Sequence, residues 1–387
     1  METTVVKLSE LTVDGKGSYG IAASAVERDE NLPTYLRITD IYDDGTLNLN
    51  DLKSVDAPDA QRYLLRPNDI VFARTGGSTG RNYFYDGSDG QFVYAGFLIK
   101  FGLDPKKVNP AFIKYYCQSE KYRNWVRSFN TGSTRGNINA QTYGNMEIEL
   151  PSREQQDYLV SVISPLDEKI KLNREINDNL ANLLQTAYQK QFGDVSKAAT
   201  QGILSDICSY SREKVAVAEL NVSTYFSTEN MLPGKAGVTE ATSLPTTPMT
   251  TACHKGDTLI SNIRPYFKKI VYCADECGCS TDVLCFTPSL SRYAAYLFST
   301  LYADKFFAFM VAGSKGTKMP RGDKQQIMTY PVALPSDEEL EEFNALALPI
   351  LTHIHSNRGE NERLAAVRDA LLPKLMSGEI DVSNISL

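Results

Sequence analysis

The sequence predicts an α/β (α+β) protein in which two globular domains are separated by two long antiparallel α-helices that form a coiled coil. Three observations lead to this prediction. The chain has 387 residues, 42% of them hydrophobic, which is enough for more than one core. The stretch LPS occurs at 150–152 and again at 334–336, and a long segment with helical periodicity follows each copy. The features before LPS also recur about 184 residues later, which indicates a pseudo-twofold internal repeat.

The segments before the two copies of LPS follow the same order. Strand-like runs at 145–151 and 327–335 directly precede them. A loop rich in glycine and serine comes before each run, at 130–139 and 311–324, and a turn followed by a short apolar strand lies further upstream, at 67–74 and 255–262. We therefore expect four regions: a first domain at 1–151, a first helix at 152–195, a second domain at 196–335 and a second helix at 336–387.

The start of each long helix is marked by a capping box. Ser152 lies three residues before Gln155, and Ser336 lies three residues before Glu339, which is the spacing that satisfies free amides at a helix start. Prolines 165 and 349 then fall at equivalent positions. Because proline inside a helix removes a hydrogen bond, we expect a kink or a restart there, with the straight parts beginning near residues 166 and 350.

Asparagines occupy equivalent positions in the two helices. Steps of four and three residues run from Leu159 to Ala187 and, 184 residues later, from Phe343 to Leu371, and each seam includes two asparagines. Antiparallel packing would pair Asn173 with Asn361 and Asn177 with Asn357, and buried pairs of this kind fix helix register. The alternative is an ordinary amphipathic helix packed on its own domain.

Charge is unevenly distributed along the chain. The net charge is −7, and residues 336–381 alone hold ten acidic and four basic side chains. The rest of the chain is therefore close to neutral, and basic patches within it could meet an anionic partner.

Two of these basic patches recur at equivalent places. Residues 121–146 hold four cations and no acid, and residues 312–328 hold four cations and one acid. Small residues let the backbone approach a phosphate, and Arg or Asn can reach base edges. A solvated loop with incidental charge is the alternative for either patch alone, but the recurrence favours DNA contact. The candidate DNA-binding residues here are Arg123, Arg127, Ser133, Thr134, Arg135, Asn137, Asn139, Ser314, Lys315, Lys318, Arg321 and Lys324.

A second polar segment in each half strengthens this interpretation. FARTGGSTGRN at 72–82 and SNIRPYFKK at 261–269 mix basic, aromatic and amide side chains, as a strand and loop that read a DNA groove would need. A surface hairpin is the alternative for any single residue. The further candidates are Arg74, Ser78, Thr79, Arg81, Asn82, Asn262, Arg264, Tyr266, Lys268 and Lys269.

The cysteines and histidines give little support for metal binding or catalysis. Seven cysteines, an odd number, favour a reducing compartment over a disulfide framework. The spacing of Cys273, Cys277, Cys279 and Cys285 differs from that of common zinc sites, so we expect packed thiols, with metal binding as the open alternative. Three histidines and no nucleophile paired with a base predict no catalytic activity.

The N-terminal residues lack the basic start and apolar run of a signal peptide, and no stretch is apolar for long enough to cross a bilayer. We therefore expect a cytoplasmic protein without membrane contact.

The plan of the whole chain resembles the specificity subunit of Type I restriction-modification systems. The resemblance is carried by residues 150–192, STENMLPGKAG at 227–237, GDTLISNIRPYFKKI at 256–270 and RDALLPKLMSGEIDV at 368–382. It implies two target-recognition domains, each reading one half of a bipartite DNA sequence. It also implies two conserved helices that set the gap and dock two methyltransferase subunits.

The same resemblance implies that the methyltransferase subunits bind S-adenosylmethionine and methylate adenine, that a restriction subunit joins through them, and that the chain itself has neither cofactor nor catalysis. The first loop, GSTRGNIN, keeps the family's spacing from Gly-Ser to Asn, whereas the second, GSKGTKMPRGD, is longer and more basic. Two other classes of function stay open: a coiled-coil adaptor without DNA readout, and a DNA methyltransferase in its own right.

Overall fold

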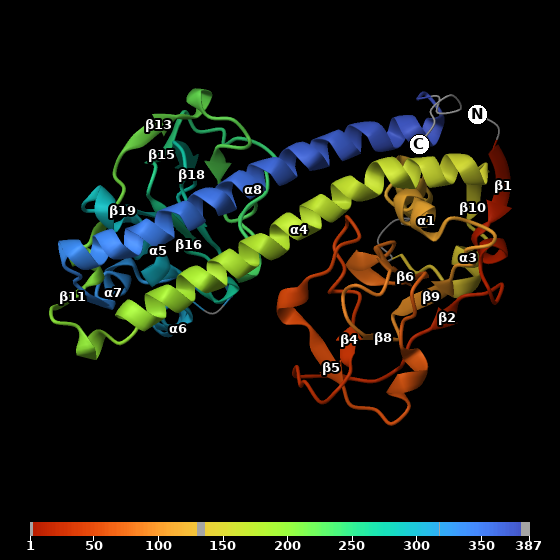
Figure 1. The fold of residues 1–387 in the computed structure, drawn as a ribbon, viewed down its shortest axis with the longest axis horizontal. Helices are drawn as coiled ribbons and strands as arrows, with labels where there is room; N and C mark the ends of the chain where they lie inside the picture. Colours follow the sequence, from red (N-terminus) through yellow and green to blue (C-terminus); the bar gives the residue numbers. More distant parts are fainter. Residues whose placement is uncertain (1–2, 130–135, 317, 381–387) are drawn as a thin grey trace. The chain divides into compact units, whose positions relative to one another are not determined.

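The structure is a computed structural model that describes residues 3–129, 136–316 and 318–380 (Figure 1). The chain divides into two compact units. Unit 1 consists of Met1–Lys169 and Arg363–Leu387, and unit 2 consists of Ile170–Glu362. Two long helices, α4 (Arg153–Phe192) and α8 (Asp337–Ser377), each contribute one part to each unit.

The described part of unit 1 contains two four-stranded sheets and one strand pair. One sheet has the antiparallel order β2 (Ser18–Tyr19), β9 (Leu98–Gly102), β6 (Asp69–Ala73), β7 (Asn82–Tyr85). The other has the order β3 (Ala25–Val26), β5 (Lys53–Val55), β4 (Thr34–Leu36), β8 (Phe92–Tyr94), with β4 and β8 parallel. The strand pair is β1 (Thr3–Lys7) with β10 (Glu147–Pro151), and the short helices are α1 (Pro110–Tyr116), α2 (Glu120–Arg127) and α3 (Ala140–Gly144).

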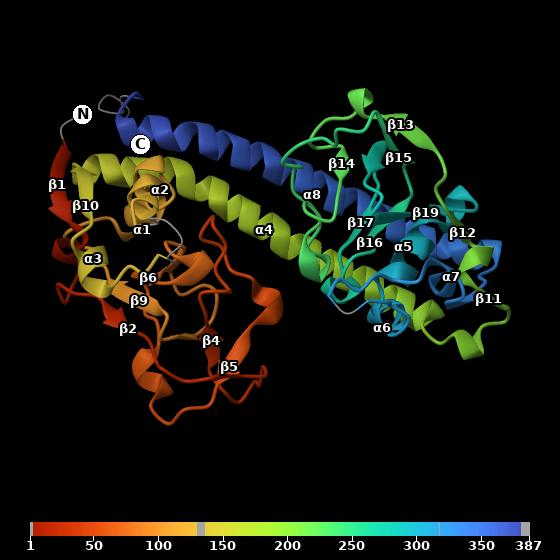
Figure 2. The same ribbon diagram turned by 180° about the vertical axis from the view of Figure 1, so that it is seen from behind.

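Unit 2 repeats this plan, as the view from behind also shows (Figure 2). Its first sheet has the antiparallel order β12 (Cys208–Tyr210), β19 (Val283–Pro288), β16 (Thr258–Ser261), β17 (Ile270–Tyr272). Its second sheet has the order β13 (Lys214–Ala216), β15 (Met249–Cys253), β18 (Cys277–Cys279), β14 (Tyr225–Phe226). The strand pair is β11 (Gln201–Ile203) with β20 (Pro331–Ala333), and the short helices are α5 (Ala294–Tyr302), α6 (Asp304–Ala312) and α7 (Lys324–Ile327).

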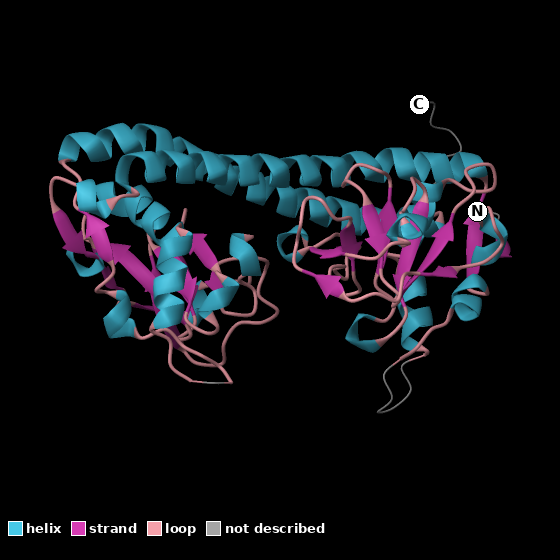
Figure 3. Ribbon diagram, turned by 90° about the horizontal axis from the view of Figure 1, so that it is seen from below, coloured by secondary structure: helices cyan, strands magenta, loops and turns pink. Residues whose placement is uncertain are grey.

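The second sheets of the two units differ in one detail. In unit 1 the parallel strand β8 lies at the edge beyond β4, whereas in unit 2 the equivalent strand β18 lies inside, between β15 and β14. Helices and sheets of each unit are distinguished by colour in Figure 3.

The central strands β6 and β16 are buried along their whole length because they lie between two cores. Alternate residues of β6 enter different clusters: Ile70 and Phe72 join the core with the helices, and Val71 joins the core with the second sheet. In β16, Ile260 and Leu259 divide in the same way. A strand covered on both faces lacks the alternation of apolar and polar residues: β6 has a continuous apolar run from residue 70 to 73, and β16 has the shorter run Leu259 and Ile260.

Both central strands also begin with the same turn. The Asp69 carboxylate accepts a hydrogen bond from the backbone amide of Arg66, and the Asp257 carboxylate accepts one from that of His254, at 2.8 Å in each case. The two aspartates are 188 residues apart, so the internal repeat extends to individual hydrogen bonds.

Both capping boxes form as predicted. The Ser152 amide donates to Gln155 Oε1 at 3.3 Å and the Gln155 amide donates to Ser152 Oγ at 3.4 Å. The corresponding distances for Ser336 and Glu339 are 2.7 and 3.2 Å. The expected restart at Pro165 is wrong, because α4 continues through that residue from Arg153. Buried Leu159 and Ile163 pack this first part of the helix into the core of unit 1, and this packing offsets the hydrogen bond that proline removes.

The two long helices pack together through the predicted asparagines. In unit 2, Asn173 Nδ2 donates to Asn361 Oδ1 and Asn357 Nδ2 donates to Asn177 Oδ1, both at 2.9 Å. The pairs show that the helices run antiparallel, since residue numbers rise along α4 as they fall along α8. The predicted fold class is therefore confirmed.

In unit 1 the two helices meet through apolar and charged contacts. Leu159 and Ile163 share a core with Leu372 and Leu375. Asp167 accepts hydrogen bonds from Lys114 Nζ at 2.8 Å and from Arg368 Nη1 at 3.0 Å, which ties α1, α4 and α8 together.

The four predicted regions at 1–151, 152–195, 196–335 and 336–387 stay a prediction, because the compact units divide within the helices. Among the helices of the described residues, none combines the length and the hydropathy that crossing a bilayer requires.

Candidate nucleic-acid interface

The two polar segments predicted in the first half meet at the end of strand β6. Thr75 and Asn137 form an antiparallel bridge, and the Ile138 amide donates to the Arg74 carbonyl at 2.9 Å. The Thr79 hydroxyl donates to the Gly136 carbonyl at 2.9 Å. We call residues 74–81 and 136–139 the unit 1 junction.

The corresponding segments meet in the same way at the end of strand β16. Ile263 and Arg321 form an antiparallel bridge, and the Gly322 amide donates to the Asn262 carbonyl at 3.3 Å. The Arg264 amide donates to the Pro320 carbonyl at 2.8 Å. We call residues 262–269 and 314–324, apart from residue 317, the unit 2 junction.

The two junctions share their capping chemistry as well. Asn139 accepts from the Thr142 amide at the start of α3, and Asp323 accepts from the Gln325 and Gln326 amides at the start of α7. Each cap fixes the second segment just after it has bridged to the strand end. Asn139, predicted to bind DNA, thus has its side-chain oxygen engaged within the fold.

At the unit 1 junction, Arg74 lies beside an aromatic ring that the sequence did not indicate. Its guanidinium lies 5.1 Å from the centre of the Tyr19 ring, and the Tyr19 hydroxyl accepts from the Ala140 amide at 3.1 Å. Arg74 Nε is buried and has no hydrogen-bond partner among the described residues. Ser78 is half-buried in the turn Gly76–Ser78, close to this arginine in sequence. Tyr19 lies far from both polar segments in sequence, so no local signal pointed to it.

Two other candidates in unit 1 are engaged within the protein. Asn82 is buried, and its Nδ2 lies 3.5 Å from the carbonyls of Gly80 and Cys117. Arg81 donates to the Asp43 carboxylate at 2.8 Å and to the Ile41 carbonyl at 3.1 Å. Both side chains therefore support the loop.

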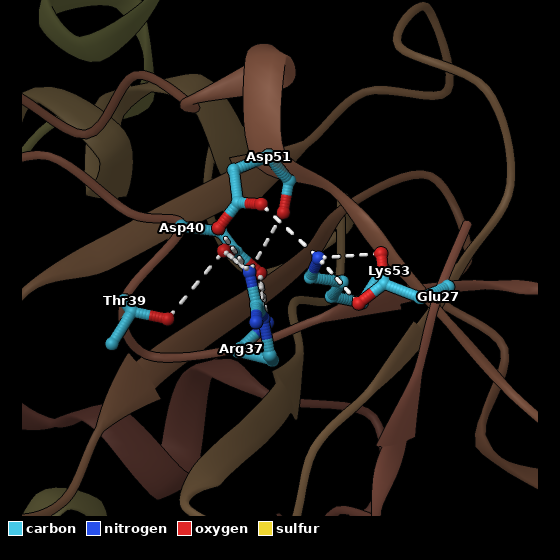
Figure 4. Close-up of polar contacts among 6 residues, drawn as sticks. All are labelled: Glu27, Arg37, Thr39, Asp40, Asp51 and Lys53. Atoms are coloured by element: carbon cyan, nitrogen blue, oxygen red, sulfur yellow. Dashed lines mark hydrogen bonds and ion pairs between the residues drawn. The ribbon is translucent and has the colours of Figure 1, made fainter. Parts of the chain in front are cut away.

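The segment that supplies Asp43 is itself held by an ionic network (Figure 4). Arg37 pairs with the buried Asp40 at 2.6 Å and with Asp51 at 3.5 Å, and Lys53 joins Asp51 to Glu27. The hydrogen bonding of the Arg37 guanidinium to the Asp40 carboxylate is the largest factor that raises the pKa of Arg37. The network fixes the fold around residues 37–53 and thus the position of the Arg81 partner.

The two arginines of helix α2 are exposed and share one acid. Arg123 and Arg127 pair with Glu120 at 3.2 and 3.4 Å. Exposed pairs of this kind are weak, so both guanidinium groups stay available to a stronger anion. Ser133, Thr134 and Arg135 lie outside the described residues.

At the unit 2 junction, two polar groups lack partners among the described residues. They are Asn262 Oδ1, in a residue only 7% exposed, and Arg264 Nε. Arg264 also adopts a left-handed conformation, with φ 51°. The exposed Tyr266 follows, and its neighbour Phe267, which was not predicted to contribute, is exposed beside it.

The two lysines that follow are tied into the fold. Lys268 pairs with Asp304 at 2.9 Å, and Lys269 Nζ donates to the Thr228 carbonyl. Burial lowers the pKa of Lys269. Hydrogen bonds from Lys235 and then Lys268 lower the pKa of Asp304, which therefore stays ionised and neutralises part of this charge.

The second segment of the unit 2 junction carries most of the exposed charge. Lys315, Lys318, Arg321 and Lys324 are all exposed, and Ser314 donates to the Val311 carbonyl at the end of α6. Arg321 pairs with Asp282 at 3.0 Å, and Lys315 pairs with Asp323. Lys315 and Arg321 exchange backbone hydrogen bonds at 2.9 Å, so the loop holds its cations on a short antiparallel bridge.

The cysteine cluster is larger than its sequence spacing indicated. Cys253, Cys277 and Cys279 come from one sheet of unit 2, Cys285 comes from strand β19 of the other sheet, and Cys273 directly follows strand β17; all five lie in one buried core. Cys277 Sγ and Cys273 Sγ are 3.6 Å apart. The residues that the structure describes contain no group of His, Cys, Asp or Glu side chains arranged to hold a metal ion.

Comparison with known proteins finds a family match in the part of the chain that contains the unit 1 junction. Residues 16–182 match the model of the Type I restriction modification DNA specificity domain. The specificity subunit of Type I restriction enzyme MjaIX from Methanocaldococcus jannaschii is 20% identical over 303 residues, which are 71% of this chain and 70% of the relative. That of HindI from Haemophilus influenzae is 21% identical over 188 residues, 48% of this chain, and the match spans only 41% of the relative's length.

The fold also matches a solved structure. The Type I restriction-modification S subunit from M. genitalium aligns with a TM-score of 0.56 at 17% identity, covering 97% of this chain and 96% of the other. The fold match over almost the whole chain agrees with the architecture described above. Residues 16–182 thus match a DNA specificity domain of Type I restriction-modification systems, and the chain is similar to Type I restriction-modification specificity subunits in sequence and in fold.

Proposed function

We propose that each junction reads one half of a bipartite DNA target and that helices α4 and α8 hold the two reading domains at a fixed spacing. The observation that carries this proposal is the duplicated junction. In both units the end of the central strand is bridged to a second polar loop through equivalent hydrogen bonds. Two copies of the same junction, one in each unit, suit a DNA target that has two separate half-sites.

The chemistry of the junctions supports contact with duplex DNA. The exposed cations Lys315, Lys318, Arg321 and Lys324 would meet phosphates. Arg74 and Asn137 provide donors, and Asn262 provides an unpartnered acceptor, that can pair with base edges. The side chains are not the same in the two junctions, since Arg74 stands where the second junction has Asn262. The two half-sites should therefore differ in sequence.

We further propose that the helix pair docks two methyltransferase subunits, which bind S-adenosylmethionine and methylate adenine, and that a restriction subunit joins through them. Within unit 2, Leu172, Ile176 and Leu183 of α4 are exposed. Spacings of four and seven residues place them along one side of the helix. An exposed apolar stripe on a charged helix is typical of a surface that a partner covers.

Salt-dependent DNA binding tests the reading proposal. Binding of the full chain to duplex DNA, measured by fluorescence anisotropy over a series of salt concentrations, should weaken steeply as salt rises. Lys318→Ala should reduce the slope of log affinity against log salt by about 1, because one phosphate contact is lost.

Arg292→Ala is the matched control, since Arg292 is also an exposed cation of unit 2 but pairs with Asp337 at 3.0 Å outside the junction. It should leave the slope unchanged. Equal effects of the two substitutions, or a wild-type affinity that does not respond to salt, would contradict the proposal and favour an adaptor without DNA readout.

A further inference from the structure

The turn that follows the central strand differs between the two junctions. In unit 1 it is Gly76–Ser78, and a Cβ atom added at Gly76 or Gly77 would have no neighbour within 4 Å. The turn therefore presents bare backbone to open space. In unit 2 the same place is taken by Pro265–Phe267, where Tyr266 is 50% exposed and Phe267 39% exposed. The two ring centres are 4.8 Å apart.

The aromatic turn is held in a strained conformation by its surroundings. Arg264 and Lys268, which flank it, have φ values of 51° and 50°, in the left-handed region that side-chain-bearing residues rarely adopt. Buried Pro265 anchors the turn, and backbone hydrogen bonds join Arg264 to Pro320 and Lys235 to Lys268 at 2.8 and 3.0 Å. Strain of this kind persists only where the fold imposes it, and it concentrates at ligand sites.

The groups around the turn suit a ligand that has both flat apolar faces and anionic edges. Exposed Lys318 and Arg321 lie on the loop that bridges to this strand end. Asn262 is only 7% exposed, and its Oδ1 lies beside Gly322 of the same junction. This oxygen has no hydrogen-bond partner among the described residues. A stack of base pairs bordered by phosphates has this combination of surfaces.

We propose that Tyr266, braced by Phe267, inserts its ring at a base step of the half-site that unit 2 reads. This inference rests on the proposed function and adds a mode of recognition to it. Insertion of a ring partly unstacks the step and kinks the duplex. Pyrimidine–purine steps deform most readily, so unit 2 selects such a step through its flexibility, whereas unit 1 approaches its half-site with bare backbone.

Fluorescence of 2-aminopurine tests the insertion. The full chain selects its preferred duplex from a pool of random sequences, and 2-aminopurine is then placed at each position of both half-sites. Wild-type protein should raise the fluorescence at one step of one half-site only, because the probe brightens when it is unstacked. Tyr266→Ala should abolish that rise and weaken binding about tenfold to a hundredfold, the usual effect of removing a stacked aromatic ring. Tyr266→Phe should keep both the fluorescence rise and the wild-type affinity, because the aromatic ring remains.

The Tyr266→Ala effect should leave the salt slope unchanged because the side chain carries no charge. Leu290→Ala, which removes a side chain that is 49% exposed elsewhere in unit 2, should change neither fluorescence nor affinity. Tight salt-dependent binding without a fluorescence rise at any position would overturn the insertion while leaving the proposed function intact. Failure of the wild-type chain to bind any duplex would overturn both.

Discussion

Replacing the paired asparagines between α4 and α8 should show how the helices keep their register. Asn173 is 1% exposed, and its Nδ2 donates both to Asn361 Oδ1 at 2.9 Å and to Glu360 Oε2 at 2.7 Å. Asn173→Ala therefore removes one hydrogen bond to a neutral group and one to a carboxylate. Net contributions of about 1 and 2 kcal/mol predict a loss of about 2–4 kcal/mol in local stability.

The second pair should cost less, because Asn177 accepts from Asn357 Nδ2 at 2.9 Å and itself donates only a long bond, at 3.5 Å, to the Ile354 carbonyl. Asn177→Ala should lower the stability by about 1–2 kcal/mol. Replacing Asn177 and Asn357 together by leucine should restore stability to about the wild-type value or above, since an apolar seam needs no polar partner. The double variant should instead lose specificity of register.

Hydrogen exchange of the helix amides in residues 170–192 measures these changes, because it reports the free energy of local opening. Asn182→Ala is the control: Asn182 lies on the same helix but is exposed, and its replacement should shift that free energy by less than about 0.5 kcal/mol. The asparagines do not fix the register if the amides are as well protected in the Asn173→Ala variant as in the Asn182→Ala variant. The same holds if the stability change of the double variant at Asn177 and Asn357 equals the sum of the two single changes.

Three further substitutions or treatments probe other parts of the structure. Burial alone would raise the pKa of Asp167, but Lys114 and then Arg368 outweigh it and lower that pKa. The ionised Asp167 therefore stabilises the fold above its unfolded-state pKa of about 4, and this stabilisation is lost as pH falls through the lower folded value. Denaturant unfolding should accordingly show Asp167→Asn destabilised by about 1–3 kcal/mol at neutral pH and by progressively less below about pH 4; a difference independent of pH would contradict this. Gly237→Ala should lower the free energy of unfolding by about 1–3 kcal/mol, because Gly237 has φ +95° and a Cβ there would lie 3.0 Å from the Arg358 guanidinium. Gly77→Ala is the control and should be tolerated, because a Cβ at Gly77 would have no neighbour within 4 Å. All seven cysteines are buried, and burial raises the pKa of Cys208 to about 12, so a thiol reagent should label them only after unfolding; fast labelling of the native chain would refute this packing.

Features that repeat along the chain could be predicted from the sequence. The capping boxes at Ser152 and Ser336 depend on neighbours three residues apart, and both form. The asparagine pairs needed only a common seam and an antiparallel direction, and the hydrogen bonds join the pairs that the numbering predicts. Strand β6 was recognisable because burial on both faces leaves an uninterrupted apolar run, and β16 because the same order of turn, aspartate and short apolar stretch recurs there.

Contacts between distant segments that the internal repeat does not relate could not be predicted. Thr75 meets Asn137 only because the α3 cap and strand β6 lie together in the folded unit. The same holds for the ion pair of Arg81 with Asp43, which engages a side chain that its sequence context marks as free to bind DNA. Strands of two or three residues, such as β4 and β14, carry no periodicity, so the altered strand order in unit 2 leaves no trace in the sequence.

Which half of the target each junction reads can be measured directly by mapping methylated adenines. Single-molecule sequencing of DNA from cells that express the chain with its methyltransferase partner should reveal a bipartite motif with two different halves. Asn137→Ala should relax the base preference in one half only, and Asn262→Ala in the other half only, because the two residues lie in different junctions. A motif without two parts, or relaxation of the same half by both variants, would contradict the account.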